Sequence, residues 1–167
     1  DEDIRLGPST GAIVDAAIRP VKDDGAVHGM AQLDLIDARL MLEGPVPFVK
    51  GLRFAAAGRR SHLDAWLKPV LELAVSGVTQ APVYYDYQFI LETNPSPGAR
   101  FRVAYFGSDD GIAILVAEPS TDEPGLSGDI GLHTAFQRLQ LRYNNDDLFG
   151  AKVAATLSFG RDNIALG

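Results

Sequence analysis

Residues 151–159 read Ala-Lys-Val-Ala-Ala-Thr-Leu-Ser-Phe, and their side chains fall into two sets by simple alternation. One set holds Val153, Ala155, Leu157 and Phe159, and the other holds Lys152, Ala154, Thr156 and Ser158. Because successive side chains of a β-strand point to opposite faces, this stretch predicts a strand with one apolar side and one polar side.

The same alternation recurs along the chain from His28 onward, in residues 30–35, 38–43, 52–57, 83–92, 100–105 and 134–143. Together with 151–159, these runs predict about seven meander strands. The phase slips at Ile36-Asp37, Pro and Gly occupy 94–98, and Asn and Asp fill 144–147. We expect tight reversals at these three places.

Two connections are longer than these turns. The first, residues 60–82, has apolar side chains at helical spacing from Leu63 to Ala74, which predicts a short loop helix that begins near Asp64 and kinks at Pro69. The second, residues 107–128, is acidic and rich in proline around 118–124. Tight turns at one end and long loops at the other are typical of outer-membrane barrels. The predicted fold class is therefore an all-β, antiparallel outer-membrane β-barrel segment.

Many charged residues are predicted on the polar sides of these strands. The basic ones are Arg53, Arg100, Arg102, Arg138, Arg142 and Lys152, and the acidic ones are Asp34, Glu43, Asp86 and Glu92. In a barrel they would line a wet lumen, where charge is tolerated. The aromatic residues Tyr85, Tyr87, Tyr105, Tyr143 and Phe159 include several that are expected near strand ends, as in the interfacial girdles of barrels.

The composition of the chain argues against several classes of function. The chain has 167 residues and a formal net charge of -7, which argues against a nucleic-acid partner because such partners normally require a basic surface. It contains no cysteine, so disulfides, thiolate catalysis and cysteine zinc sites are excluded. No apolar run approaches the roughly 18–20 residues of a membrane helix, whereas barrel strands need only about 9–11 alternating residues.

Residues 1–26 differ from the rest of the chain. Residues 11–19 read as one strand, which Pro20 and the turn-forming Asp23-Asp24-Gly25 bring to an end. We therefore divide the chain into an N-terminal segment, 1–26, and a sheet-forming region, 27–167.

No constellation for catalysis or metal binding stands out. The three histidines, His28, His62 and His133, are far apart in the sequence, and the acidic pairs at 109–110, 122–123 and 146–147 lack the spacing of a calcium loop. Ser61, His62 and Asp64 supply the residue types of a hydrolase triad, but neighbours in one loop seldom converge and no Gly-x-Ser-x-Gly elbow is present. We therefore predict no enzyme activity, no metal and no cofactor.

Ligand contact is predicted at the ends of the two long connections. Arg59, Arg60, Asp64 and Trp66 lie at the mouth of the first, and Asp109 and Asp110 lie at the start of the second. The alternative for Arg59 and Arg60 is that they hold the loop in place through ion pairs.

Several short motifs resemble one family when they are taken in order. Ser9-Thr10-Gly11-Ala12-Ile13-Val14-Asp15 resembles the end of the plug domain in TonB-dependent outer-membrane receptors. The opening barrel strands of such receptors are similar to four later stretches: Gly44-Pro45, Ala57-Gly58-Arg59-Arg60-Ser61-His62-Leu63-Asp64, Tyr84-Tyr85-Asp86-Tyr87-Gln88 and Phe106-Gly107-Ser108-Asp109-Asp110. The resemblance extends from about Leu6 to Gly167.

The resemblance implies a barrel of about 22 strands filled by a plug, which takes up a scarce ligand across the bacterial outer membrane with energy from a TonB-type coupling protein. Residues 1–26 would end the plug and 27–167 would begin the barrel. We expect the chain to be a receptor segment or a truncated relative. Its partners would be outer-membrane lipid and the remainder of the barrel and plug. A different class stays open: a soluble all-β binding or interaction domain whose apolar faces pack on each other as a sandwich.

Overall fold

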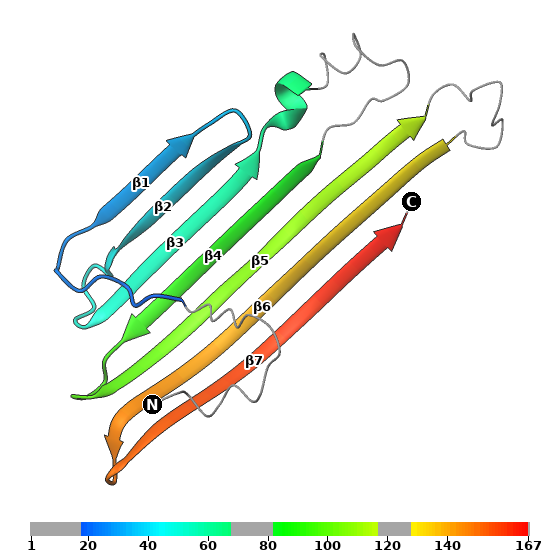
Figure 1. Cartoon of the computed structure of the whole chain (residues 1–167). Helices are drawn as coiled ribbons and strands as arrows, with labels where there is room; N and C mark the ends of the chain where they lie inside the picture. Colours follow the sequence, from blue (N-terminus) through cyan, green and yellow to red (C-terminus); the bar gives the residue numbers. More distant parts are fainter. Residues whose placement is uncertain (1–17, 68–81, 117–127, 167) are drawn as a thin grey trace, which may run out of the picture.

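The protein forms one seven-stranded antiparallel sheet in which every strand pairs with the next along the chain. The computed structural model describes residues 18–67, 82–116 and 128–166. The strands are β1 (His28–Leu33), β2 (Asp37–Pro45), β3 (Leu52–Ser61), β4 (Val83–Thr93), β5 (Ala99–Val116), β6 (Gly128–Leu148) and β7 (Ala151–Leu166). The predicted all-β meander is confirmed. The sheet is open, with β1 and β7 at its edges, and it fits a segment of a barrel wall (Figure 1).

The connections differ in length between the two ends of the sheet. At one end, which we call the short-turn end, lie residues 46–51, 94–98 and 149–150. At the other, which we call the long-loop end, lie the turn at 34–36 and the described residues that flank the two longer connections: 62–67 and Pro82 for the first, Val116 and Gly128 for the second (Figure 1). Residues 63–67 form the first turn of the predicted loop helix, and residues 68–74 of that prediction lie outside the described residues. No helix in the described part of the chain is long and apolar enough to cross a membrane.

Two predicted connections are wrong, and for the same physical reason. Residues 107–116 belong to β5 and not to a long loop, because they pair with β4 as far as Gly111 and with β6 throughout. Residues 144–147 belong to β6, which turns only at Phe149 and Gly150. Pairing with neighbouring strands outweighs the turn preference of Gly, Ser, Asn and Asp, since strand propensity depends strongly on context.

The β6–β7 turn shows where the chain reverses instead. Asp146 and Asp147 stand opposite a single residue, Lys152, which is a β-bulge. Phe149 and Gly150 both have positive φ, 56° and 82°, as a tight hairpin turn requires. The bulge accommodates one more residue on β6 than on β7, so the chain reverses at Phe149 and Gly150 and not at residues 144–147.

The first reversal and the N-terminal strand also need correction. The turn spans 34–36, so Leu35 lies in the turn, Asp37 begins β2, and the Asp34 amide donates to the Asp37 carbonyl at 3.0 Å. Of the predicted strand at 11–19, residues 11–17 lie outside the described residues, and Ile18 and Arg19 are not in a strand.

One side of the sheet, the apolar face, has a continuous row of apolar side chains across β2 to β7. The strand register aligns Leu42, Ala56, Phe89, Tyr105, Leu139 and Phe159. The row beside it aligns Phe54, Leu91, Val103, Leu141 and Leu157. These side chains are not enclosed: Phe89 is 44% exposed, Leu139 38% and Phe159 56%. Tyr105 and Phe159 lie mid-strand and not at strand ends, because β5 and β7 are longer than expected.

The opposite side, the polar face, carries the small core of the described structure. Val21 is buried against Ala55, Ile90 and Ala104, with Phe106 packed beside them. Val21 belongs to residues 18–27, which we call the N-terminal strap and which crosses the polar face (Figure 1). Glu43 and Glu92 are also buried there, at 0% and 1% exposure. The core therefore combines a few apolar contacts with buried charge.

Candidate functional site

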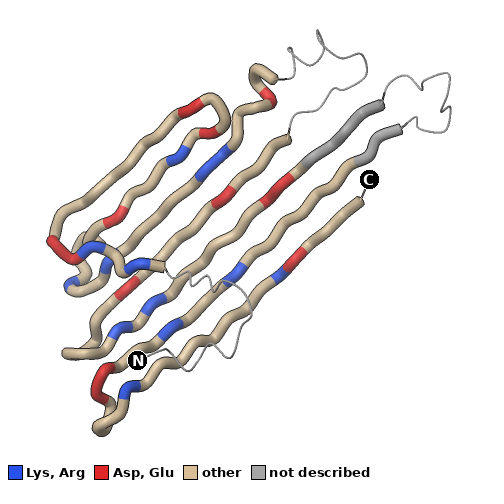
Figure 2. Tube along the Cα trace, in the orientation of Figure 1, with Lys and Arg blue, Asp and Glu red and all other residues tan. Residues whose placement is uncertain are grey.

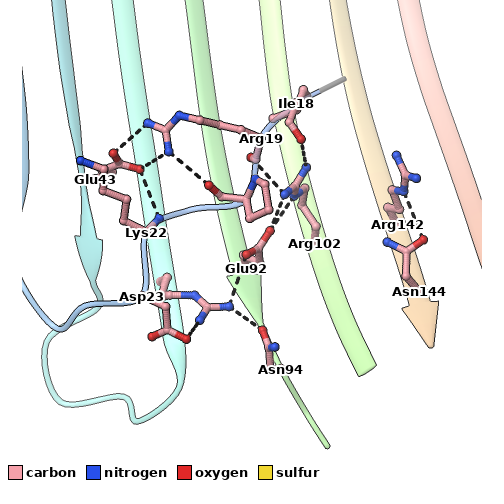
Figure 3. Close-up of polar contacts among 12 residues, drawn as sticks. Ile18, Arg19, Lys22, Asp23, Glu43, Glu92, Asn94, Arg102, Arg142 and Asn144 are labelled. Carbon is pink, nitrogen blue, oxygen red and sulfur yellow. Dashed lines mark hydrogen bonds and ion pairs between the residues drawn. The ribbon is translucent and has the colours of Figure 1, made fainter. Parts of the chain in front are cut away.

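The N-terminal strap is held to the polar face by charged groups (Figure 3). The Arg19 guanidinium donates to both carboxylate oxygens of Glu43, at 2.8 and 2.7 Å, and the Lys22 amide donates to the same carboxylate at 3.4 Å. Such a two-pronged contact between guanidinium and carboxylate is among the stronger hydrogen-bonded ion pairs.

A second set of contacts lies one row closer to the short-turn end (Figure 3). Arg102 donates from Nε to Glu92 at 2.9 Å and from its two Nη atoms to the carbonyl oxygens of Ile18 at 3.0 Å and Arg19 at 3.2 Å. Arg53 pairs with the strap residue Asp23 and with Glu92. Arg53 and Arg102 therefore share one buried carboxylate and both reach the strap.

Sequence reasoning placed these charges on the polar face but did not find their partners. Glu43, Arg53, Glu92 and Arg102 alternate with apolar residues, which is the signal that places them on one side of a strand. Their contacts with the strap, ion pairs and backbone hydrogen bonds together, join residues 21 to 84 positions apart in the sequence. Periodicity within a strand contains no information on such distant contacts.

A third ionic cluster lies toward the long-loop end of the polar face. Arg39 donates to both carboxylate oxygens of Asp37, at 2.7 and 3.1 Å, and the Tyr84 hydroxyl donates to Asp37 at 2.9 Å. The Arg59 side chain bonds to Asp86 from Nε at 2.6 Å and lies over the Tyr84 ring, 4.7 Å from its centroid. Asp37 itself is 2% exposed.

Between this cluster and the strap, the polar face has a mostly apolar hollow of about 330 Å³. Its polar lining is Arg39, Arg59, Asp86 and Gln88, and its apolar lining includes Met30, Met41, Ala57, Phe106 and Phe136. Since each of the two arginines already pairs with a carboxylate, this hollow presents apolar surface with a neutral ionic rim.

The structure does not gather the predicted ligand-contact residues into one site. Arg59 and Asp110 lie on the polar face, whereas Arg60 and Asp109 lie on the apolar face, because neighbours in a strand alternate sides. Asp64 and Trp66 lie in the helical turn 63–67. A single pocket lined by all six residues is therefore excluded.

Each of these six residues has a partner among the described residues. Arg60 bonds to Tyr85 at 3.2 Å and to Asp64 at 3.3 Å, and the Trp66 indole donates to the Leu35 carbonyl at 2.8 Å. Asp109 lies 2.9 Å from His133, and the Ser108 hydroxyl donates to Asp110 at 2.7 Å. The contacts of Arg60 and Trp66 attach the helical turn 63–67 to β3 and to the turn at 34–36, whereas Arg59 pairs with β4 within the sheet.

Two further findings concern chemistry. No group of three or more potential metal-ligating side chains gathers within the ranges that the structure describes. The Ser61 hydroxyl donates to the Pro82 carbonyl at 3.3 Å and accepts from the Tyr84 amide at 3.0 Å, so it ties β3 to the start of β4.

Comparison of the chain with known proteins gave no match to a family model, a curated protein or a solved structure.

Proposed function

We propose that the chain is part of an outer-membrane β-barrel of the TonB-dependent receptor type, which takes up a scarce ligand across the bacterial outer membrane. The observation that carries this proposal is the exposed row of Leu42, Phe89, Tyr105, Leu139 and Phe159 on the apolar face. Soluble proteins rarely leave so extended an apolar surface uncovered, and the hydrocarbon core of a bilayer is the solvent that suits it.

The polar face supports the same proposal. Its buried ion pairs and its contacts with the N-terminal strap suit the inner wall of a barrel against the end of a plug. The open edges at β1 and β7 would pair with further strands, because unpaired backbone groups facing lipid cost several kcal/mol each. The long-loop end would face the outside and capture ligand, and a TonB-type protein would supply the energy for its passage.

The experiment compares matched substitutions on the two faces. Leu139→Lys places a charge on the apolar face, and Gln140→Lys places the same charge on the polar face, one residue further along β6. A charge in the middle of a lipid-facing surface costs about 2–4 kcal/mol. Folding into lipid vesicles, followed by heat-modifiable migration on a gel, should be lost or weakened in Leu139→Lys and retained in Gln140→Lys.

Two results would contradict the proposed function. A chain that stays monomeric in buffer without detergent and melts cooperatively there would be a soluble all-β domain, and the transport proposal would be wrong. Equal effects of the two lysine substitutions would also oppose it.

A further inference from the structure

At the short-turn end of β5, β6 and β7, the polar face has a second hollow, with a volume of about 610 Å³. We call it the basic hollow. Its charged lining is Arg100, Arg142, Lys152 and Asp146, its polar lining includes Asn94 and Asn144, and Gly98 and Ala154 complete much of its wall. Figure 2 shows the basic residues of these strands close together at this end of the sheet. The volume falls in the range of about 300–1,000 Å³ that is usual for small-molecule sites.

The cations of the basic hollow differ from the other arginines of the polar face. Arg39, Arg53, Arg59, Arg102 and Arg138 each pair with a carboxylate. Within the described parts of the chain, no carboxylate lies within ion-pair distance of Arg100, Arg142 or Lys152. The side chain of Arg142 reaches only the neutral amide oxygen of Asn144, at 3.3 Å (Figure 3).

Two details show that this charge is built into the hollow. Arg142 stands directly opposite Arg102 in the strand register, and like charges in that position repel unless an anion compensates them. Glu92 already compensates Arg102, and no carboxylate of the described residues pairs with Arg142. The Nε atom of Arg100 is buried and lacks a hydrogen-bond partner in the described structure, which costs free energy unless an acceptor is supplied.

The nearby acids do not neutralise the hollow. Among the described residues that line it, Asp146 is the single carboxylate, against three cations. The Asp147 carboxylate accepts the Gly150 amide at 3.0 Å and is used to close the β6–β7 turn. A net positive charge therefore remains, with neutral hydrogen-bonding amides from Asn94 and Asn144 around it.

We propose that the basic hollow binds a phosphate dianion, either as inorganic phosphate or as the phosphate group of a small organic molecule. Two guanidinium forks and one ammonium group suit the three oxygens and the double charge of a phosphate better than the single charge of a carboxylate. This inference goes beyond the proposed function and does not depend on it, because Arg100, Arg142 and Lys152 lie on the polar face and the argument uses no contact with lipid.

The test is calorimetric titration of the purified full chain in neutral detergent, in phosphate-free buffer at constant ionic strength. Inorganic phosphate, glycerol phosphate and acetate are the three probes. The proposal expects phosphate, glycerol phosphate or both to bind, and acetate to bind much more weakly. Binding of inorganic phosphate alone would identify free phosphate as the ligand, whereas tighter binding of glycerol phosphate would identify a phosphorylated molecule.

Two substitutions that each remove one arginine, Arg142→Gln on β6 and Arg161→Gln on β7, are compared for their effect on phosphate binding. Arg142→Gln should weaken phosphate binding about tenfold, as expected for loss of one charge-assisted contact. Arg161→Gln removes the same charge from β7, but on the apolar face, and should leave binding unchanged. Arg142→Lys, which keeps the charge without the fork, should weaken binding by a smaller factor and serves if Arg142→Gln does not fold.

Three results would overturn the proposal. The first is that the unchanged chain binds none of the phosphate probes, and the second is that it binds acetate as tightly as phosphate. Equal weakening in Arg142→Gln and Arg161→Gln would show that phosphate responds to overall charge and not to this hollow.

Discussion

At the scale of single residues, the buried carboxylates decide how the polar face is held together. Glu92 is 1% exposed and contacts two arginines that are themselves buried, Arg53 and Arg102. Asp162, by contrast, pairs with Arg138 at the surface, with side-chain exposures of 62% and 31%. The contributions of these two carboxylates to stability differ, because only Glu92 and its two arginines are removed from water.

Glu92→Ala should therefore lower the free energy of unfolding by about 3–5 kcal/mol, since it leaves the buried Arg102 without its counter-charge and Arg53 with Asp23 alone. Asp162→Ala should lower it by less than about 1 kcal/mol. Urea unfolding of the two variants beside the unchanged chain measures both values. Similar losses in the two variants would contradict the distinction drawn between the pairs.

A turn carboxylate gives a pH prediction. Asp34 accepts hydrogen bonds from the amides of Asp37 and Ile36, which hold the pKa of its carboxyl below the ordinary value of 3.8. Because the folded pKa lies below the unfolded one, the stabilisation is present above pH 3.8 and is lost as pH falls through the folded value. Asp34→Ala should be less stable than the unchanged chain near neutral pH, and the gap should close in strong acid. A gap that persists or widens in acid, measured by urea unfolding across the pH range, would contradict this.

At the scale of elements, the N-terminal strap is the part of the described structure that is not in the sheet yet packs on it. Its attachment combines the Arg19–Glu43 and Asp23–Arg53 ion pairs with one buried apolar side chain, Val21. A short segment without strand pairing needs such contacts, because ordering each residue costs about 1–2 kcal/mol of backbone entropy.

Val21→Ala should loosen the strap, because two methyl groups leave the cluster with Ala55, Ile90 and Ala104 at a cost of roughly 1.6 kcal/mol. Tryptic cleavage after Lys22 should then be faster by about tenfold. Val27→Ala is the matched control, because Val27 lies in the same segment but is 61% exposed. Cleavage at the same rate in both variants would show that Val21 does not hold the strap.

Some features of the strands could be predicted from the sequence and others could not. The faces of β4 and β7 follow from alternation alone, and Phe89 and Leu157 lie on the side expected of them. The lengths of β5 and β6 could not be predicted, because Gly107, Asp109 and Asn144 have weak strand propensities that only pairing on both sides overrides. The Arg19–Glu43 and Arg53–Glu92 ion pairs join residues 24 and 39 positions apart, which a local pattern does not encode.

At the scale of the whole molecule, the two faces of the sheet have opposite surroundings. The polar face buries charge beneath the strap, while the apolar face leaves Leu40 64% exposed and Phe159 56% exposed. The arrangement is inside-out relative to a soluble domain, in which apolar side chains form the interior. Our account of function rests on the claim that the apolar face meets lipid.

Spin labels on single cysteines test that claim most directly, and the chain has no native cysteine to interfere. Cysteine is introduced in turn at 138 to 142 on β6, and the collision rates of each label with oxygen and with a water-soluble nickel complex are measured in lipid vesicles. Our account predicts that oxygen collisions dominate at 139 and 141 and fall at 138, 140 and 142, in step with the two faces. Labels at 139 and 141 that are shielded from both reagents, as in a protein interior, would contradict it.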